Sequence, residues 1–571
     1  MKQCPKCKRV YNDESLNYCL DDGQTLLLGP ALTEPPTKLF TTDPPETDAR
    51  TEQLYRSGDG PAVSSGAAVN RPRQTSIWVF SSLLVVLIVG GLMAYRFWPA
   101  GGKQVDSIAV LPFENKGGDA DTDYLSDGLT DSLMYRLSQL PGLAVTPRST
   151  VFRYKGTNVD PIQIGNELGV SAVLSGRIVE RGDDLTISVE LVDIRRNKLL
   201  WGEQYNRKIS DLLATQREIA QEISEKLRAT VTGNSAKPEK HYTENNEAYQ
   251  LYLKGRFYWD KRTYEGMNKA IGHFEQAIRI DPNFALAYAG LAACYVAPGV
   301  RLPPDQAMPK AKAMAKRAIE LDDSLPEAHT VLARVYAAYD WDWPSAEREY
   351  KRAIELDPRY PIAHQWYGGY LESQGHREAA MAERKLALEL DPLSLILNFE
   401  LGQAYYFARD YDLAVEQYQK TLELDSSFSP ALQFLPAALE QQGKLTEAIE
   451  AFHRSPVLNV AGEWTMTKAG LGHAYALSGK KEEALAIIED LKKQSEQQYI
   501  PAVSLALVYA GLGDKEQAFA WLEKGYQERG FQMQWLNAEP RWDSLRSDPR
   551  FADLVKRIGL NQAVRPTGQG T

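Results

Sequence analysis

Residues 391–426 read DPLSLILNFELGQAYYFARDYDLAVEQYQKTLELDS, and this stretch decides the fold of the second half of the chain. Leu401, Gly402 and Tyr405 have the spacing of one helix face, and Ala414 and Tyr418 have the spacing of a second. Small residues allow two helices to approach closely, and a proline stops a helix because it cannot donate the next hydrogen bond. The stretch therefore predicts two packed helices joined by a turn.

Acidic turns recur around this stretch at intervals near 34 residues. They are Asp281-Pro282, Asp322-Asp323, Asp357-Pro358, Asp391-Pro392 and Asp425-Ser426. The period and the pattern resemble the tetratricopeptide repeat family. The resemblance runs from Glu247 to Arg529 and implies roughly eight helix pairs, stacked as an α-solenoid that we place at residues 245–530.

Some features depart from the repeat pattern. They are an insertion around Gly299 to Pro304, the turn Trp341-Asp-Trp343, and Pro436 at a position where a small residue is expected. After the last pair, Trp535 to Leu560 is typical of a terminal cap that shields the final apolar face, and we place this cap at residues 531–562.

The resemblance implies a concave surface lined by the first helix of each pair. The candidate partner-binding residues on that surface are Gln365, Glu372, Phe399, Gln403, Tyr406, Gln433 and Glu440. A plain solvated surface is the alternative for these residues. The surface lacks the Asn and Lys array with which some relatives clamp a peptide carboxylate, so we do not expect that class of ligand.

The stretch from Ile77 to Tyr95 (IWVFSSLLVVLIVGGLMAY) lies in a region without charge between Arg73 and Arg96. Its length suffices to cross a hydrocarbon core of about 30 Å as a helix. Trp78 and Trp98 supply the aromatic rings expected at the two water interfaces. We predict a transmembrane helix at residues 75–98, retained as an anchor because about seventy polar residues precede it.

The orientation of this helix follows from the cysteines, because the flanking basic residues are nearly balanced. Three of the four cysteines precede the helix, and Cys294 alone follows it, so the long C-terminal portion can form no internal disulfide. We predict a single-pass protein of the bacterial inner membrane, with the N-terminus cytoplasmic and the C-terminal domains periplasmic.

The first 30 residues contain paired metal-ligand turns, Cys4-Pro-Lys-Cys7 and Cys19-Leu-Asp-Asp22-Gly23. They resemble the bacterial zinc-ribbon family, with Asp22 at the position of the last cysteine. The resemblance implies one structural zinc ion held by Cys4, Cys7, Cys19 and Asp22, since a carboxylate oxygen is also a zinc ligand. A vestigial turn without metal is the alternative. Residues 31–74, rich in Pro, Thr, Ser and Gly, are expected to be a flexible linker.

Residues 104–232 alternate between strand-like and helical patterns in the order βαβαβββα. Strands are expected at Ser107 to Phe113, Leu143 to Pro147, Ala172 to Glu180, Leu185 to Asp193 and Leu199 to Tyr205. Helices are expected at Tyr124 to Leu140, Asp160 to Leu168 and Ile209 to Thr230. This order predicts a small mixed α/β domain with helices on one face of the sheet.

Several phrases of this domain occur in the order of a known family: IAVLPFEN, YLSDGLTDSL, PRSTVFRYKG, ELGVSAVLSGRI and LLWGEQY. They resemble the TolB amino-terminal-like module, which is related to FlgO. The resemblance implies a sensory or envelope-associated interaction module without catalytic residues. Members of that family are fused to kinases, cyclases and winged-helix regulators, usually ahead of tetratricopeptide repeats.

No motif of catalysis stands out in the 571 residues, whether a phosphate-binding Gly-rich loop, an HExxH pair or a serine nucleophile elbow. His364 and His376 flank a repeat turn, where a packing role is favoured over a catalytic one. The formal net charge of −10 argues against a surface that coats nucleic acid. We therefore expect no enzyme, no nucleic-acid partner and no small-molecule substrate.

The sequence thus predicts a multidomain protein. It comprises a short zinc-ribbon-like motif, a transmembrane helix, a small mixed α/β domain and an α-solenoid of tetratricopeptide repeats. The function expected of it is a membrane-anchored scaffold that binds a protein or peptide in the repeat groove. The alternative is a transmembrane signalling or transcription regulator, whose cytoplasmic zinc ribbon relays occupancy of the outer domains.

Overall fold

The computed structural model describes residues 105–117, 122–138, 140, 142–228, 243–261, 263–297, 302–455 and 465–560, together with three short strands near the start of the chain. The chain divides into two compact units, Met1–Arg96 and Phe97–Thr571. In the first unit, β1 (Lys2–Gln3) pairs antiparallel with both β2 (Val10–Tyr11) and β3 (Leu27–Leu28).

The N-terminal predictions fall mainly on residues outside this description. They are the zinc ligands Cys4, Cys7, Cys19 and Asp22, the linker at 31–74 and the membrane helix at 75–98. Every helix in the described ranges falls short of the length and apolarity that crossing a bilayer requires. The zinc site and the anchor therefore stay predictions.

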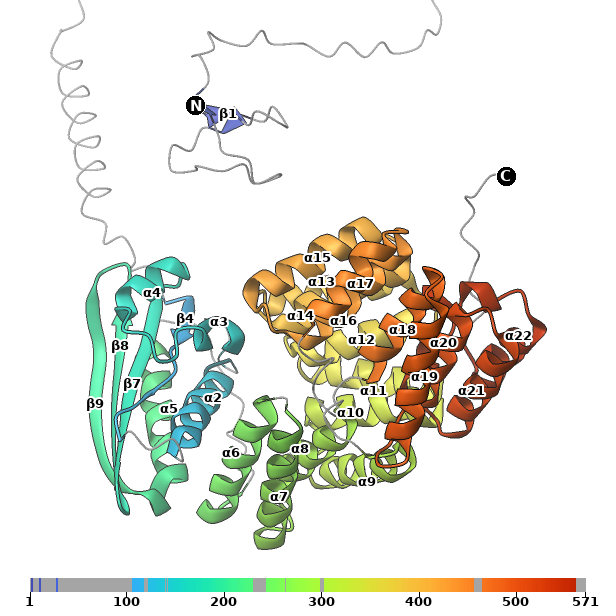
Figure 1. Cartoon of the computed structure of the whole chain (residues 1–571). Helices are drawn as coiled ribbons and strands as arrows, with labels where there is room; N and C mark the ends of the chain where they lie inside the picture. Colours follow the sequence, from blue (N-terminus) through green and yellow to red (C-terminus); the bar gives the residue numbers. More distant parts are fainter. Residues whose placement is uncertain are drawn as a thin grey trace, which may run out of the picture. The chain divides into compact units, whose positions relative to one another are not determined.

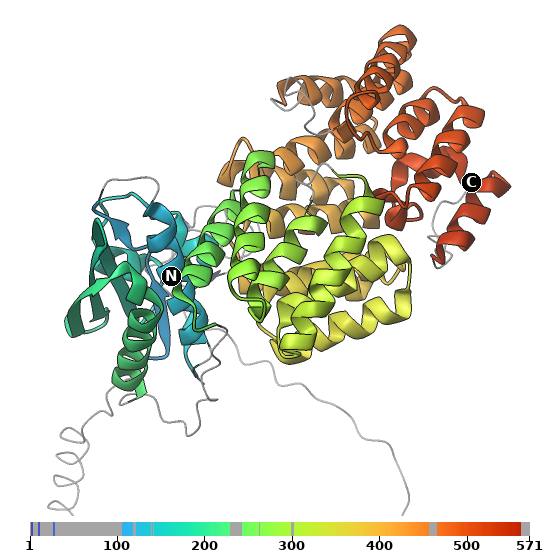
Figure 2. The same ribbon diagram turned by 90° about the horizontal axis from the view of Figure 1, so that it is seen from below.

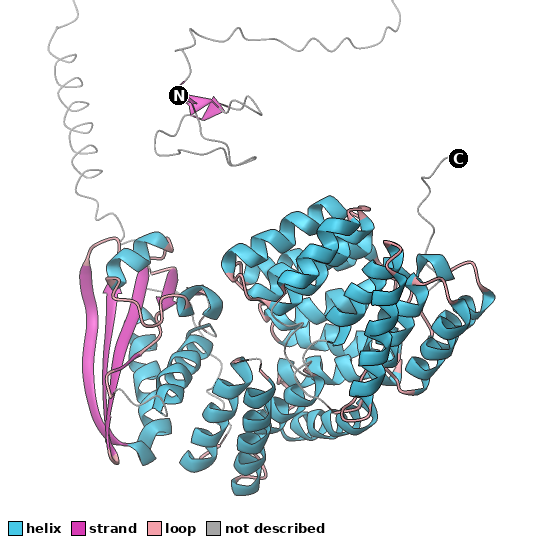
Figure 3. Cartoon of the chain, viewed as in Figure 1, coloured by secondary structure: helices cyan, strands magenta, loops and turns pink. Residues whose placement is uncertain are grey.

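The second unit begins with a mixed sheet, as the strand pattern predicts. Its strands run in the order β6-β4-β7-β8-β9, with β5 (Glu114–Asn115) beside β7. The first three, β6 (Ala144–Val145), β4 (Ser107–Val110) and β7 (Ala172–Arg181), are parallel. The next two, β8 (Asp184–Asp193) and β9 (Lys198–Lys208), continue the sheet antiparallel. Figure 3 shows the long strands grouped in this domain.

Helices cover both faces of the sheet, so the prediction of helices on one face is wrong. Ile108 and Val110 of β4 pack with α2 (Asp123–Ser138) and α5 (Leu212–Arg228). Ala109 and Leu111, which point the other way, pack with α3 (Arg148–Phe152) and α4 (Pro161–Glu167). The parallel strands are buried on both sides, as parallel strands usually are. The five-residue helix α3 is not among the helices expected from the sequence pattern.

The solenoid consists of eight helix pairs within the described residues, which confirms the predicted tetratricopeptide fold (Figures 1 and 2). The pairs are α6 (Asn246–Asp260) with α7 (Tyr264–Ile280), α8 (Ala285–Val296) with α9 (Pro304–Leu321), α10 (Pro326–Val335) with α11 (Trp343–Leu356), α12 (Pro361–Ser373) with α13 (Arg377–Leu390), α14 (Leu395–Ala408) with α15 (Tyr411–Leu424), α16 (Ser429–Gln441) with α17 (Leu445–Arg454), α18 (Thr465–Leu477) with α19 (Lys481–Ser495), and α20 (Ala502–Gly511) with α21 (Lys515–Gln527).

The turns between pairs are held by a side chain from the next helix. Nε2 of His364 lies 2.9 Å from the carbonyl oxygen of Pro358, and its Nδ1 lies 2.6 Å from Glu383. One repeat later, Nδ2 of Asn398 donates to the carbonyl of Pro392 at 2.9 Å. The packing role expected for His364 therefore has a clear basis, since both of its ring nitrogens are engaged in holding a turn.

Gly402 allows the two helices of a pair, α14 and α15, to approach closely. A Cβ atom at this position would lie 2.5 Å from Cε1 of the buried Tyr418 ring. We expect Gly402→Ala to lower the free energy of unfolding by about 1–3 kcal/mol, because the ring must shift in a packed core. At Gly272, in the interior of α7, a Cβ meets nothing within 4 Å. Gly272→Ala should therefore stabilise the helix by about 0.5–1 kcal/mol. Thermal unfolding of the two variants would show opposite shifts, and equal shifts would contradict the packing argument.

The C-terminal segment, residues 531–560, lies across the first helices of several pairs. It contains the short helices η5 (Phe531–Trp535) and η6 (Pro540–Leu545), followed by α22 (Pro549–Ile558). Nε1 of Trp535 donates to the carbonyl of Gly369 in α12, and the Trp535 ring stacks on Phe407 in α14. We call this the C-terminal segment below. It extends beyond the terminal cap role expected for it, because it also contacts pairs in the middle of the solenoid.

Candidate partner-binding site

Most of the residues predicted to line the repeat groove are buried in contacts within the chain. Phe399 packs between the rings of Tyr418 and Phe434. The hydroxyl of Tyr406 donates to Oε1 of Glu539 in the C-terminal segment, at 2.6 Å. Gln403 and Gln433 are also buried. The predicted role of these side chains in partner binding stays a prediction, but the structure engages or covers them in the solenoid itself.

Two of the predicted residues, Glu372 and Glu440, lie against buried basic side chains of the solenoid. Glu372 Oε2 accepts a hydrogen bond of 2.9 Å from Nη2 of Arg384, and Arg384 also pairs with Glu400. Glu440 Oε1 lies 2.9 Å from Nδ1 of His473. Burial raises the pKa of Glu372, and the Arg384 guanidinium opposes that rise. Both carboxylates therefore stabilise the arrangement of neighbouring repeats.

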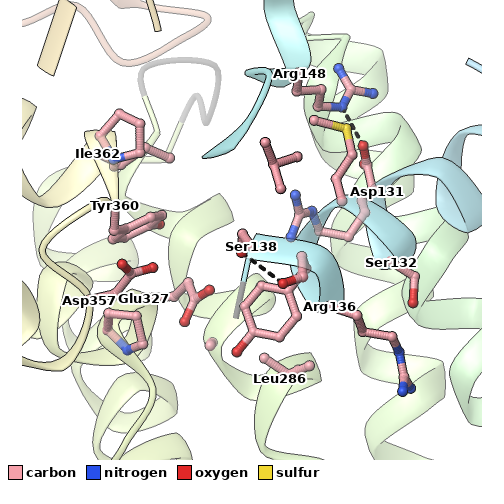
Figure 4. Close-up of a pocket in the computed structure, with 18 of the residues that line it drawn as sticks. Asp131, Ser132, Arg136, Ser138, Arg148, Leu286, Glu327, Asp357, Tyr360 and Ile362 are labelled. Carbon is pink, nitrogen blue, oxygen red and sulfur yellow. Dashed lines mark hydrogen bonds and ion pairs between the residues drawn. The ribbon is translucent and has the colours of Figure 1, made fainter. Parts of the chain in front are cut away.

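A cleft of about 1070 Å³ lies between the α/β domain and the first repeats. One wall comes from α2, α5 and the start of α3, and the other comes from α6 and the N-terminal ends of α8, α10, α12 and α14. Gln365 is the member of the predicted set that lines it. Figure 4 shows Glu327, Asp357 and Tyr360 on the solenoid wall, with Asp131, Ser132 and Arg148 on the opposite wall.

Arg148 joins the two walls at one end of the cleft. Its Nε donates to Oδ1 of Asp131 on α2 at 2.8 Å, and its Nη2 lies 3.0 Å from Oδ2 of Asp260 at the end of α6. The adjacent Ser149 hydroxyl donates to Asp391, in the turn before α14. Burial raises the pKa of Asp131 to about 6, against the lowering effect of Arg148. Polar contacts therefore tie the α/β domain to the solenoid.

Apolar packing reinforces the same joint. Helix α2 packs against α6, and Gly128 allows the close approach, because a Cβ there would lie 2.8 Å from Cδ1 of Leu253. The buried side chains of the sheet, α2 and α6 form one continuous core with the first repeats. The cleft is thus built between two rigidly packed walls, as ligand sites commonly are.

The solenoid wall carries one side chain from the same position of four successive first helices. The second residues of α8, α10, α12 and α14 are Leu286, Glu327, Ile362 and Ile396, and all four line the cleft. Three are aliphatic and one is a carboxylate. Burial raises the pKa of Glu327, the nearby Asp357 raises it further, and Arg256 opposes the rise. Glu327 is not among the site residues predicted from the sequence, although a carboxylate among Leu and Ile at the same repeat position is a visible signal.

Two family models match parts of the chain. Residues 103–222 match the second domain of HilA/YgeH-like transcriptional regulators, and residues 397–428 match the tetratricopeptide repeat. The α/β domain thus matches a regulator's domain, and its resemblance to the TolB amino-terminal-like module stays a prediction.

Two curated relatives share parts of the sequence. "Putative adenylate cyclase 3" of Rhizobium meliloti is 32% identical over 232 residues, which cover 40% of this chain and 39% of the relative. "Transcriptional regulator HilA" of Salmonella typhimurium is 25% identical over 303 residues, which cover 52% of each chain. The chain therefore spans about half or less of the length of these relatives.

Solved structures with a similar fold include Pseudomonas aeruginosa PilF, with 20% identity and a TM-score of 0.30, covering 39% of this chain and 96% of that one. A tetratricopeptide repeat protein from Parabacteroides merdae has 14% identity and a TM-score of 0.35, covering 47% of this chain and 100% of that one. The repeat model at residues 397–428 and the eight helix pairs show that the second half of the chain has a tetratricopeptide repeat fold.

Proposed function

We propose that the chain is a membrane-anchored interaction scaffold whose protein or peptide partner enters the cleft between the α/β domain and the first repeats. The observation that carries this proposal is the difference between the two ends of the first helices. The C-terminal segment covers the C-terminal parts of α12 and α14, through contacts such as Trp535 with Gly369 and Tyr406 with Glu539. The N-terminal ends of α8, α10, α12 and α14 line an open cleft instead.

The composition of the cleft supports a peptide-like partner. Its volume of about 1070 Å³ lies just above the range of about 300–1,000 Å³ typical of ligand sites. Aliphatic and aromatic side chains such as Leu286, Ile362 and Trp366 alternate with charged groups along its walls. An extended segment with mixed side chains would match this pattern better than a uniformly apolar ligand.

The predicted membrane anchor would determine the cellular location of the scaffold. The stretch from Ile77 to Tyr95 would hold the protein in the bacterial inner membrane, with the cleft on the periplasmic side. The zinc ribbon formed by Cys4, Cys7, Cys19 and Asp22 would be a structural element on the cytoplasmic side. These parts of the proposal rest on the sequence.

Site-specific photo-crosslinking in cells tests the location of the partner. Tyr135 lines the cleft and is 42% exposed, so a benzophenone amino acid at this position should give a discrete protein adduct. Ile362→Trp, which fills part of the cleft, should lower the yield of that adduct at least about fivefold. A loss of 1.4 kcal/mol of binding free energy lowers the affinity tenfold. The matched control is Leu386→Trp, because Leu386 is exposed on α13 and does not line the cleft.

The same crosslinker at Leu477 gives the negative control, since Leu477 is exposed at the end of α18 and lies away from the cleft lining. Equal adducts at Tyr135 and Leu477, or no adduct at Tyr135, would contradict the cleft as the partner site.

A second candidate function, a transmembrane regulator, is favoured by one observation. Residues 103–222 match a domain of transcriptional regulators, and HilA is a relative over 303 residues. In this proposal the cytoplasmic ribbon would contact nucleic acid or a signalling protein when the cleft is occupied. Binding of residues 1–76 to nucleic acid at physiological salt would support it. If that binding disappears between 50 and 200 mM salt, it is a non-specific contact with phosphates and does not support the regulator.

A further inference from the structure

Glu327 stands out on the solenoid wall of the cleft because its neighbours at the same repeat position are aliphatic. Leu286, Ile362 and Ile396 occupy that position in α8, α12 and α14. A carboxylate in such a row costs desolvation energy unless a donor or a cation satisfies it. Placing Glu327 in the first turn of α10 lets the helix dipole offset part of that cost.

The contacts within the chain leave this carboxylate incompletely satisfied. Its Oε2 is enclosed and has no hydrogen-bond partner among the described residues. The nearest guanidinium, that of Arg256, opposes the rise in the pKa of Glu327 but makes its own hydrogen bond to the hydroxyl of Tyr252, at 3.4 Å. Nε of Arg256 is likewise enclosed and without a partner in the described part of the chain. One acceptor and one donor of residues that line the cleft thus remain unpaired.

The charge around Glu327 is negative. Asp357 and Asp322, in the turns before α12 and α10, both raise the pKa of Glu327 through their own charges. Figure 4 shows Glu327 and Asp357 beside each other on the solenoid wall. On the opposite wall, the Arg148 guanidinium is committed to Asp131 and Asp260. The position at Glu327 therefore attracts a cation.

We propose that the cleft recognises a lysine or arginine side chain of an extended partner segment. Its cationic group binds Glu327 and Asp357, and its aliphatic stem lies along Leu286 and Ile362. Long basic side chains combine an apolar stem with a charged end, which is the pattern of this wall. Arg256 Nε donates to a backbone carbonyl of the same segment. This inference rests on the proposed function, because it names the chemistry of the partner in the same cleft.

A position-scanning library of fluorescein-labelled 12-residue peptides, bound to the purified full chain, tests the inference. Peptides with Lys or Arg at one position should bind about tenfold more tightly than the peptide with norleucine at that position. A difference of this size is the effect of one charge-assisted hydrogen bond. Glu327→Gln, which keeps the shape of the side chain, should reduce that preference to less than about twofold. Glu327→Lys should transfer the preference to Asp or Glu. Circular dichroism of each variant checks that the fold is retained.

The matched control is Glu378→Gln, because Glu378 lies in the first turn of α13, is exposed, and does not line the cleft. It should keep the full preference. The preference of the unmodified protein should also weaken on acidification, as the raised pKa of Glu327 is approached and the carboxylate takes up a proton.

The outcomes separate this inference from the proposed function. Peptides that bind without a preference for a cation, or with a preference unchanged in Glu327→Gln, overturn the inference and leave the cleft as the partner site. Failure of every peptide to bind overturns both.

Discussion

Replacing Arg384 by Met is expected to lower the local free energy of unfolding of α12–α14 by about 3–5 kcal/mol, because it leaves the buried Glu372 and the partly buried Glu400 without their cation. The side chains of Arg384 and Glu372 are 3% and 4% exposed. Nε and Nη2 of Arg384 donate to the two oxygens of Glu372 at 3.3 and 2.9 Å, and Nη1 pairs with Glu400. Native-state hydrogen exchange of the α12 and α13 amides measures the loss, since repeat proteins unfold in parts.

The pH dependence of this variant has a defined sign. Burial raises the pKa of Glu372 above its ordinary value, and Arg384 opposes the rise. A carboxyl group whose pKa is raised in the folded state binds its proton more tightly there than in the unfolded chain, so its contribution to stability falls as the pH rises. Without Arg384, the pKa of Glu372 in the folded state rises further. The deficit of Arg384→Met should therefore shrink as the pH falls from neutrality.

Two further variants control the experiment. Arg377→Met removes an exposed arginine at the start of the same helix and should change stability by less than about 0.5 kcal/mol. The triple variant with Glu372→Leu and Glu400→Leu should recover much of the loss, because an apolar replacement leaves no unpaired charge. Equal effects of Arg384→Met and Arg377→Met would show that the buried ion pair contributes little.

The repeat architecture could be predicted from the sequence because each helix pair contacts mainly its neighbours. Packing between neighbours imposes the same residue types every 34 residues, as with Tyr350, Tyr418 and Phe452, which are all buried. Arg384 occupies the corresponding position of the intervening repeat. A charged residue at an aromatic position was thus a visible sign of a buried ion pair, although the position alone could not identify its partners.

The cleft could not be predicted in the same way, because it depends on contacts without a period. The hydrogen bond between Ser149 and Asp391 joins residues 242 positions apart. The helices α3 and α6 that carry Arg148 and Asp260 belong to different folds with no shared pattern. The resemblance to tetratricopeptide repeats predicts a partner-binding surface that includes Tyr406 and Glu440. It predicts which helices line that surface, but it cannot show that the chain's own C-terminal segment contacts and covers Tyr406.

Replacing Arg541 by Leu is expected to release the C-terminal segment from the first helices of the solenoid, with a local loss of about 3–5 kcal/mol. Arg541 and Glu539 are both buried, and Nε and Nη2 of Arg541 each donate to Glu539 at 2.9 Å. Glu539 also accepts from the Tyr406 hydroxyl at 2.6 Å, which connects the ion pair to α14. Without Arg541, Glu539 and the nearby Glu440 would remain buried without this cation.

The pH dependence here has the opposite sign to that of Glu372. Burial alone would raise the pKa of Glu539, but Arg541 and Tyr406 hold it below its ordinary value. A depressed pKa contributes stability that is present above the unfolded value of about 4.3 and is lost as the pH falls through the folded value. In the unmodified protein, the C-terminal segment should therefore loosen in acid, below about pH 4. In Arg541→Leu it should already be loose at neutral pH.

Limited proteolysis and hydrogen exchange of residues 531–558 distinguish these states. Arg550→Leu is the matched control, because Arg550 pairs with Glu516 and Asp548 at the exposed surface of the same segment, where solvent screening leaves such pairs little effect on stability. Release in Arg541→Leu should also uncover Tyr406 and Glu440, so a second surface for partners would open beside the cleft. If residues 531–545 stay equally protected in both arginine variants, the apolar contacts of Met533, Leu536 and Trp542, rather than the ion pair, hold the segment in place.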